Sequence, residues 1–339
     1  MKAKNLNGKA PGGKRQKLVD ILPLDTPLIV QLFPVYACIF ECCYCIFSKP
    51  REEHGFISDK VNLDFNLYKK FVQDFKKFPN KAKMWRFVGI GEPLMWKYIA
   101  EAVAITKMAD VCERTEIITN AVLLTYEMSN NLIKAGLDRM VVSLQGVTSE
   151  QYYKTCNKEI NIKNIIEYLT YYYNNKKEGQ ELYIKIADVA LENEGDEEKF
   201  YDLFGDICDG IAIEKIVPLH DIKYLKDLER SEEKTQFNMP IQNTDVCTVP
   251  FNFIQLNPDG NIVPCYSWDY PEIIGNVVEE SIYDIWKGEK FNNFRINMLE
   301  KGMSCNKICD ECNMFTYRAF SEDIIDEKTK IKLIDFYKN

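Results

Sequence analysis

Over the first two thirds of the chain, short apolar runs rich in β-branched residues alternate with longer segments of helical period. The short runs predict six strands, at 28–31, 83–88, 116–119, 139–144, 183–187 and 210–216. The intervening segments predict five helices, at 64–78, 95–111, 125–135, 162–175 and 196–207. This alternation predicts an α/β fold with parallel strands and right-handed crossovers, as an open sheet or a partial barrel. Reactive residues are then expected at the carboxyl ends of the strands.

The pattern changes after residue 220. Residues 221–246 are charged and lack a clear apolar period, as a linker or lid would. Residues 247–320 predict a small cysteine-rich domain with a hairpin turn at Pro258-Asp259-Gly260 and a helix at 282–286. Ser321 could cap a last helix over 321–339, and the basic residues 1–25 are expected to form a flexible tail.

Composition and charge bear on the cellular compartment and on the class of binding partner. The 339 residues include 43 basic and 51 acidic side chains, which gives a net charge of −8. Residues 1–17 contain six basic residues and no acidic one, so the rest of the chain carries a net charge of −14. Because so acidic a body is a poor electrostatic match for a phosphate backbone, we expect no nucleic-acid partner. No apolar run is long enough for a membrane span and no secretory signal is present, so we expect a cytoplasmic protein that does not bind membranes.

Cysteine is abundant and histidine is scarce, with 12 cysteines and two histidines. In a reducing compartment, clustered cysteines usually bind metal. Thiolate ligands without histidine favour zinc or an iron–sulfur cluster.

The first cysteine group follows the first predicted strand. Cys38, Cys42 and Cys45 have the spacing C-x3-C-x2-C. Three thiolates in one loop can hold one face of a cubane cluster and leave the fourth iron open, whereas usual cluster ligation takes four. A structural zinc site or unliganded thiols are the alternatives.

Two further features make the sequence resemble the radical S-adenosylmethionine enzymes. Tyr44 precedes the third cysteine, and the run Gly89-Ile90-Gly91-Glu92-Pro93 follows the second strand. The resemblance covers about residues 26–218 and implies a partial (β/α)6 barrel over residues 26–220. It also implies a [4Fe-4S] cluster that binds S-adenosylmethionine, and oxygen-sensitive, anaerobic chemistry through a 5′-deoxyadenosyl radical. Gly89 and Gly91 would let the backbone approach the cofactor, and Glu92 would accept hydrogen bonds from its ammonium group.

Weaker matches to the same family lie at later strand ends. The resemblance implies cofactor contacts from Asn120, from Ser143 and Gln145 near the ribose, and from Lys185 near the carboxylate. Local capping or solvation of these side chains is the alternative reading.

The second cysteine group contains Cys247, Cys265, Cys309 and Cys312, a closed set for one cluster or one zinc ion. It resembles the auxiliary-cluster domains called SPASM and their shorter twitch relatives, which implies an auxiliary [4Fe-4S] cluster. A full SPASM domain has enough cysteines for two clusters and this chain does not, so Cys305 is a spare or an alternative ligand. A zinc ribbon is the alternative.

The remaining cysteines are expected to be buried apolar residues, although Cys156 or Cys208 could donate a hydrogen atom to a substrate radical. His220 could take a substrate proton. Since only about 25 residues precede the first strand, too few for a leader-binding domain, we expect a small polar substrate. A carbohydrate or cyclitol would be dehydrogenated or epimerised at a carbinol carbon, with the auxiliary cluster handling the second electron and a flavodoxin or ferredoxin type reductant.

Two other functions stay open at this point. Some peptide-modifying enzymes bind their leaders through separate proteins, so a maturase of a ribosomally made precursor peptide is the first alternative. A non-catalytic iron–sulfur or zinc protein is the second, although the glycine-rich loop at 89–93 argues against it.

Overall fold

One continuous sheet organises the computed structural model, which describes residues 1–9, 15–53, 60–218, 233–267 and 269–339. Within these residues the sheet has ten strands in the order β1-β7-β6-β5-β4-β3-β2-β8-β9-β10. Its parallel core confirms the predicted partial barrel and consists of β2 (Ile29–Leu32), β3 (Ala82–Phe87), β4 (Cys112–Thr119), β5 (Arg139–Leu144), β6 (Glu181–Ala187) and β7 (Gly210–Glu214).

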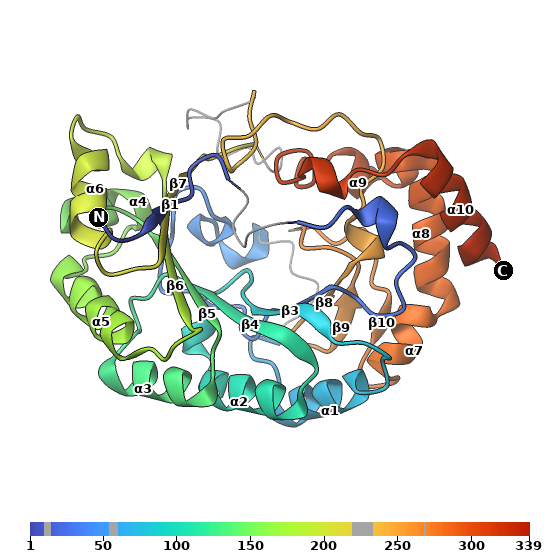
Figure 1. The fold of residues 1–339 in the computed structure, drawn as a ribbon, viewed down its shortest axis with the longest axis horizontal. Helices are drawn as coiled ribbons and strands as arrows, with labels where there is room; N and C mark the ends of the chain where they lie inside the picture. Colours follow the sequence, from blue (N-terminus) through green and yellow to red (C-terminus); the bar gives the residue numbers. More distant parts are fainter. Residues whose placement is uncertain (10–14, 54–59, 219–232, 268) are drawn as a thin grey trace.

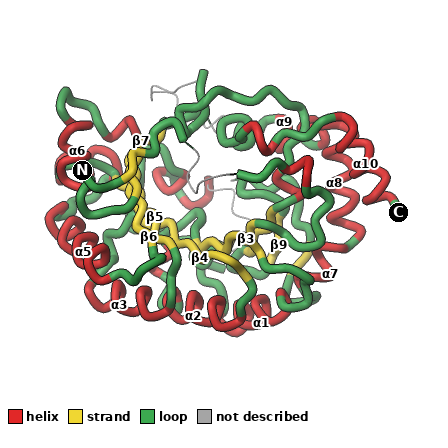
Figure 2. The backbone as a smooth tube through the Cα atoms, in the orientation of Figure 1, coloured by secondary structure: helices red, strands yellow, loops and turns green. Residues whose placement is uncertain are grey.

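Helices cover the outer side of this curved sheet (Figures 1 and 2). They are α1 (Phe65–Phe75), α2 (Ile99–Ala109), α3 (Tyr126–Ala135), α4 (Ser149–Cys156), α5 (Ile162–Asn175) and α6 (Asp196–Phe204). Short 3-10 turns occur at η1 (Leu18–Asp20), η2 (Ile46–Ser48), η3 (Arg51–Glu53), η4 (Pro93–Met95), η5 (Asp188–Ala190), η7 (Val249–Phe251), η8 (Gly302–Cys305) and η9 (Ser321–Asp323).

Packing of α1 on β3 shows how the outer layer forms. The Asp64 side chain caps α1 by accepting a hydrogen bond from the Leu67 amide at 2.9 Å. Phe71 and Phe75 then place their rings 5.5 and 5.1 Å from that of the fully buried Trp85. Because side chains alternate along a strand, the residues beside Trp85 point to the inner side of the sheet.

The C-terminal region extends the same sheet. Strand β8 (Phe253–Leu256) pairs with β2 in parallel, and β9 (Asn261–Val263) returns antiparallel to β8. The predicted hairpin is therefore present, and it continues the sheet of the barrel. Strand β10 (Gly275–Asn276) and four helices complete the region: α7 (Ile282–Lys287), α8 (Glu289–Lys301), α9 (Lys307–Asp310) and α10 (Glu327–Lys338).

Two predictions about the chain ends need correction. The described part of the N-terminal segment is packed, because β1 (Lys4–Asn5) pairs with β7 and Arg15 forms an ion pair of 2.5 Å with Asp323. The last helix begins at Glu327 because the Asp326 side chain caps it, while Ser321 begins only the short turn η9. The predicted linker or lid at 221–246 lies partly outside the described residues.

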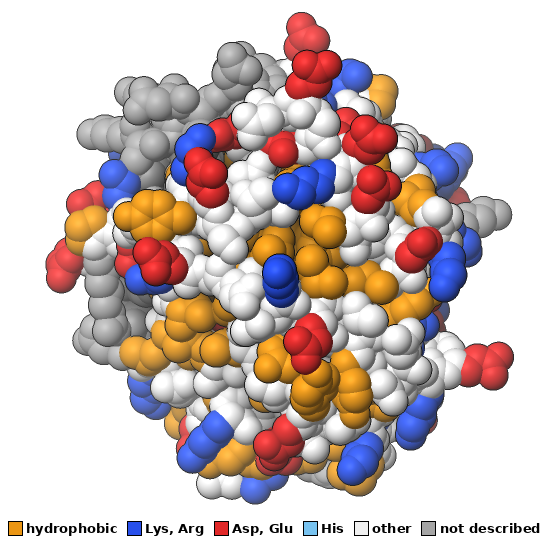
Figure 3. Space-filling view, turned by 90° about the vertical axis from the view of Figure 1, so that its left-hand side faces the viewer, with side chains coloured by type: hydrophobic (Ala, Val, Ile, Leu, Met, Phe, Trp, Pro, Cys, Tyr) orange, Lys and Arg blue, Asp and Glu red, His pale blue; other side chains and the backbone are white. Residues whose placement is uncertain are grey.

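One side of the molecule is mixed in charge. On the face that carries α5 and α6, acidic and basic side chains alternate around apolar areas (Figure 3). In the described parts of the chain, every helix is too short or too polar to span a lipid bilayer.

Candidate active site

The first cysteine group lies in the loop that follows β2. Cys42 is buried, and Cys38 and Cys45 are half-buried. The end of α4 holds this loop, because the Glu41 amide donates to the Cys156 carbonyl at 3.1 Å and the Cys43 amide to the Thr155 carbonyl at 2.8 Å.

The three thiols of this loop affect one another electrostatically. Burial, with smaller contributions from the charges of Glu92 and Cys45, raises the pKa of Cys38 to about 12. A hydrogen bond with Cys156, followed by burial and the charges of Cys45 and Cys38, raises the pKa of Cys42. A cationic metal centre would offset this cost, since metal binding deprotonates thiols.

The glycines of the 89–91 loop are required by close packing within the protein. Gly91 has φ = +151°, and a Cβ there would lie 2.0 Å from the Val35 carbonyl oxygen. Gly89 has φ = +148°, and a Cβ there would lie 2.3 Å from the Phe33 ring. Both glycines therefore seat this loop against the segment that leads into the cysteine loop. The prediction explained them only by approach to a cofactor.

Glu92 is buried and joins two of the predicted motifs. Its carboxylate accepts hydrogen bonds from the Thr119 hydroxyl at 2.6 Å, the Asn120 amide at 2.8 Å and the Leu94 amide at 3.0 Å. Burial raises the pKa of Glu92, and these three hydrogen bonds act in the opposite direction. The Glu92 amide in turn donates to the Ala37 carbonyl at 2.8 Å, beside Cys38.

Asn120 reaches the cysteine loop directly. Its side-chain amide donates to the Cys38 sulfur at 3.8 Å. The next residue, Ala121, is buried with φ = +60°, a left-handed conformation that favours glycine. Thr119, which was not predicted as a site residue, holds Glu92 in place.

The other predicted cofactor residues lie on the inner side of β5 and β6. The Tyr44 hydroxyl donates to the Gln145 side-chain oxygen, so two predicted residues contact each other. Ser143 is half-buried on β5, and its carbonyl accepts from the Gln145 amide at 3.0 Å. Lys185 forms an ion pair of 2.5 Å with Glu214 on β7, a partner that was not predicted.

The predicted hydrogen-atom donors are poorly placed for that role. Cys156 is fully buried on α4, beside Cys42, and its thiol donates to the Tyr152 carbonyl at 2.9 Å. Cys208 is fully buried just before β7, at the opposite end of the sheet from the cysteine loop, and donates to the Phe204 carbonyl at 3.2 Å. His220 lies outside the described residues.

The inner face of the sheet carries charged and amide side chains. Glu116 on β4 forms ion pairs with Arg86 at 2.6 Å and with Arg139 at 3.4 Å. Gln31 on β2 donates to the side-chain oxygen of Gln255 on β8 at 3.0 Å, and both amides are buried. None of these residues was predicted, because a strand pattern shows alternation but does not show which polar side chains meet across strands.

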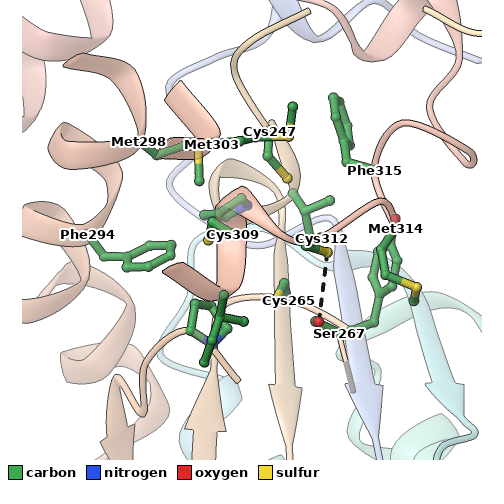
Figure 4. A pocket seen from close by; sticks show the side chains of 15 residues that line it. Cys247, Cys265, Ser267, Phe294, Met298, Met303, Cys309, Cys312, Met314 and Phe315 are labelled. Atoms are coloured by element: carbon green, nitrogen blue, oxygen red, sulfur yellow. Dashed lines mark hydrogen bonds between the residues drawn. The ribbon is translucent and has the colours of Figure 1, made fainter. Parts of the chain in front are cut away.

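The second cysteine group lines a largely apolar cavity of about 40 Å³ (Figure 4). Cys247, Cys265, Cys309 and Cys312 border it, and Phe294, Met298 and Phe315 close its sides. Ser267 lies within hydrogen-bond distance, 3.8 Å, of the Cys312 sulfur.

The fifth cysteine of this region, Cys305, contacts Cys309 through a thiol–thiol hydrogen bond. It lies on η8, next to the cavity residue Met303, so its place is compatible with a spare or alternative ligand.

The two cysteine groups lie at opposite ends of the β2–β8 pair. The first follows the carboxyl end of β2, whereas Cys247 precedes β8 and Cys265 follows the returning strand β9. Four residues of strand, roughly 13 Å, separate these ends.

Both thiol sets are compatible with iron–sulfur clusters. Among the described residues, no three His, Cys, Asp or Glu side chains gather as ligands of one metal ion. A cluster binds each thiolate through a different iron and needs its thiols spread around a larger centre. In the lining of the second cavity, the cysteine sulfurs are the main groups that could bind a metal centre.

Comparisons with known proteins agree with the two-site arrangement. The family model of the radical SAM superfamily matches residues 32–204, which is half of the chain. The model of SPASM, an iron-sulfur cluster-binding domain, matches residues 247–313.

Two curated relatives cover most of the chain. The S-adenosyl-L-methionine-dependent 2-deoxy-scyllo-inosamine dehydrogenase of Niallia circulans is 23% identical over 278 residues, 81% of this chain and 88% of that protein. The tungsten-containing aldehyde ferredoxin oxidoreductase cofactor-modifying protein of Pyrococcus furiosus is 25% identical over 306 residues, 76% of this chain and 80% of that protein.

Solved structures show the same fold. BtrN in complex with AdoMet and 2-DOIA superposes with a TM-score of 0.53 and 19% identity, over 88% of this chain and 98% of that one. Streptococcus suis SuiB bound to precursor peptide SuiA has a TM-score of 0.60 and 15% identity, over 92% of this chain and 77% of that one. The cofactors implied by both domains are [4Fe-4S] clusters and S-adenosylmethionine. The chain therefore belongs to the radical SAM superfamily, as an enzyme with a C-terminal SPASM iron–sulfur domain.

Proposed function

We propose that this enzyme dehydrogenates a small polar substrate, a carbohydrate or a cyclitol, at a carbinol carbon. The observation that carries the proposal is the inner face of the sheet, which lies between the two cysteine groups and presents charged and amide side chains, among them Arg86, Glu116 and Lys185. Such groups suit a hydroxyl-rich molecule, since they donate and accept several hydrogen bonds.

The proposed ligands follow from the two groups. Cys38, Cys42 and Cys45 hold the cluster that binds S-adenosylmethionine, and Cys247, Cys265, Cys309 and Cys312 hold the auxiliary cluster. When bound, these cofactors supply a 5′-deoxyadenosyl radical that removes a hydrogen atom, and an acceptor for the second electron. Glu92, oriented by Thr119 and Asn120, has acceptor capacity left for the ammonium group of the cofactor.

The protein's own task is to position the substrate and to exclude water. Tyr44 and Gln145, joined by their hydrogen bond, fix one side of the proposed cofactor site. Gly89, Gly91, Ser143 and Lys185 complete the residues that we propose to border it. A flavodoxin- or ferredoxin-type protein is the proposed electron donor.

Dehydrogenation is favoured over epimerisation by the placement of the thiols. An epimerase must return a hydrogen atom to the substrate radical, and Cys156 and Cys208 were the residues predicted for this. Both thiols are fully buried and donate to carbonyls of their own helical segments, so neither is presented to the inner face. Loss of one electron and one proton from the substrate radical then gives a ketone.

The comparisons support a small polar substrate but do not decide between it and a peptide. One relative is named as a dehydrogenase of an aminocyclitol, and one neighbour in fold was solved with a precursor peptide. Peptide modification is accordingly the alternative that the experiment must separate.

The test uses the anaerobically reconstituted enzyme with a chemical reductant, S-adenosylmethionine and two panels, one of sugars and cyclitols and one of short peptides. We expect 5′-deoxyadenosine to form in equal amount with a ketone product from the first panel. Deuterium at the oxidised carbon should appear in 5′-deoxyadenosine, and solvent deuterium should not enter the carbinol position. Turnover with peptides alone would contradict the proposed substrate class, and solvent deuterium in an inverted alcohol would contradict dehydrogenation.

A further inference from the structure

Arg318 brings a positive charge from the C-terminal region to the inner face of the sheet. It follows the last cysteine of the second group, and its Nε donates to the Gln236 side-chain oxygen at 2.8 Å. Gln236 also donates to Glu214 on β7 at 2.6 Å. The guanidinium carbon lies 5.6 Å from the centre of the Tyr266 ring.

The other inner-face cations nearby have carboxylate partners. Lys185 pairs with Glu214 at 2.5 Å and Arg86 pairs with Glu116 at 2.6 Å. Within the described ranges, Arg318 forms no ion pair, and Nε is the guanidinium nitrogen with a hydrogen bond. The other N–H groups of the Arg318 guanidinium therefore have no hydrogen-bond acceptor among the described residues.

The surroundings make this charge costly. Burial is the largest cause that lowers the pKa of Arg318, and the charge of Arg86 also lowers it, whereas the charges of Tyr266, Glu214 and Cys312 act in the opposite direction. Glu214 cannot neutralise it fully, because it already accepts from both Lys185 and Gln236. A partly desolvated cation without a counter-ion is unfavourable unless a ligand supplies one.

Among the described inner-face side chains, the strand cations are paired. Arg86, Arg114, Arg139 and Lys185 form ion pairs with the carboxylates Glu116, Glu181 and Glu214, whereas Arg318 is a further cation without such a partner. Arg318 follows Cys312 by six residues and lies near Tyr266, which borders the cavity of the second cysteine group. An anion bound there would lie between the two proposed cluster sites.

We propose that Arg318 binds an anionic group of the substrate, a phosphate or a carboxylate. The inference rests on the proposed function for the placement of the substrate, and it narrows the substrate to anionic sugars or cyclitols. A planar guanidinium matches phosphate and carboxylate oxygens with two parallel hydrogen bonds. An amino sugar would place a second cation beside Arg318 and be disfavoured.

The test measures equilibrium binding to the reconstituted enzyme with S-adenosylmethionine, by calorimetry and without reductant. The probes are inorganic phosphate, glucose 6-phosphate, glucuronate, glucose and glucosamine. We expect the anionic probes to bind, and Arg318→Gln to weaken them by about 10- to 100-fold, as loss of a charged hydrogen-bond pair does. Arg318→Lys should retain part of the affinity.

Arg114→Gln is the matched control. This residue is also an arginine on the sheet, but it pairs with Glu181 and is expected to leave anion binding unchanged. Iron content and thermal unfolding of each variant show whether it is folded and loaded.

Equal binding of phosphate by the wild type and Arg318→Gln would overturn the inference. So would a change confined to the electron paramagnetic resonance signal of the auxiliary cluster, since Arg318 would then serve that cluster alone. Arg318-dependent binding of phosphate without oxidation of any sugar would sustain the anion site and contradict only the proposed substrate class.

Discussion

Gly91 shows most plainly how one residue determines the shape of the site. The Val35 carbonyl oxygen occupies the place of its missing Cβ, and the backbone has a positive φ. A side chain there would separate the 89–91 loop from the cysteine loop. This separation would move Glu92, the next residue, which is held to the Ala37 carbonyl.

We predict that Gly91→Ala disrupts the site. The substitution adds a clash at 2.0 Å and backbone strain of about 1–2 kcal/mol, so S-adenosylmethionine binding should fall at least tenfold. Gly179→Ala is the control, because Gly179 also has a positive φ, +84°, but no atom lies within 4 Å of its Cβ position. Calorimetry should show intact binding for the control, and equal loss in both variants would contradict the packing argument.

Glu92 gives the second prediction at this scale. In Glu92→Gln, an amide donor faces the donors of Thr119, Asn120 and Leu94, so unfolding free energy should fall by about 1–3 kcal/mol. If Glu92 also accepts from the cofactor ammonium, affinity for S-adenosylmethionine should fall about tenfold.

Thr119→Val separates these two effects. It removes one hydrogen bond to Glu92 but keeps the carboxylate, so we expect a stability loss of about 1 kcal/mol with nearly unchanged cofactor affinity. Unchanged affinity in Glu92→Gln would show that Glu92 has only a structural role.

At the scale of elements, Glu116 ties three strands together. It lies on β4 and pairs with Arg86 on β3 and Arg139 on β5. Burial by itself would raise its pKa, but the two arginines outweigh burial and lower it below the ordinary value of 4.5. Its carboxylate is therefore a stronger acid in the folded than in the unfolded chain.

Because the pKa of Glu116 is lower in the folded than in the unfolded chain, its contribution to stability depends on pH. The contribution of Glu116 to stability is present above pH 4.5 and is lost as the pH falls through its folded-state pKa. We predict that Glu116→Gln lowers unfolding free energy by about 3 kcal/mol at neutral pH, because two arginines lose their partner. The difference from the wild type should shrink in acid.

Denaturant unfolding at several pH values checks this prediction. Glu113→Gln is the control, because Glu113 is on the same strand but pairs with Lys83 at the exposed surface. The control should change stability by less than about 1 kcal/mol. A deficit for Glu116→Gln that does not depend on pH would contradict the electrostatic explanation.

Hydrophobic periodicity predicted helices and strands where the buried positions are occupied by apolar residues. The predicted bounds of β5 and α5 coincide with those observed. Helix α4 was not predicted because its buried positions include the polar residues Gln151 and Thr155, which hide its apolar face. Helix α8 was not predicted either, although its apolar residues from Phe291 to Leu299 recur at helical spacing and could have indicated it.

At the scale of the whole molecule, the sequence identified both cysteine groups but did not predict where they lie relative to each other. Local spacing identifies ligands in one loop, whereas the parallel pairing of β8 with β2 depends on contacts more than 200 residues apart. The same limit applies to Thr119 beside Glu92 and to Gln236 beside Arg318. Long-range pairs such as these define the site and leave no local pattern in a single sequence.

The two ends of the chain also meet. Arg15 pairs with Asp323 and lies 4.1 Å from the centre of the Phe320 ring, which ties the N-terminal segment to the C-terminal region. The segment at 1–25 was expected to be a free tail, because its basic charge gives no sign of a partner so distant in the sequence.

The central claim is that one chain holds two different iron–sulfur clusters, of which only the first cleaves S-adenosylmethionine. The most direct measurement combines iron content and reductive cleavage in the anaerobically reconstituted wild type, Cys42→Ala and Cys312→Ala. We predict about eight irons and cleavage in the wild type, since two [4Fe-4S] clusters contain eight. Cys42→Ala should keep about four irons and lose cleavage, and Cys312→Ala should keep about four irons and still cleave the cofactor. About two zinc ions per wild-type chain, with no cleavage, would contradict the account.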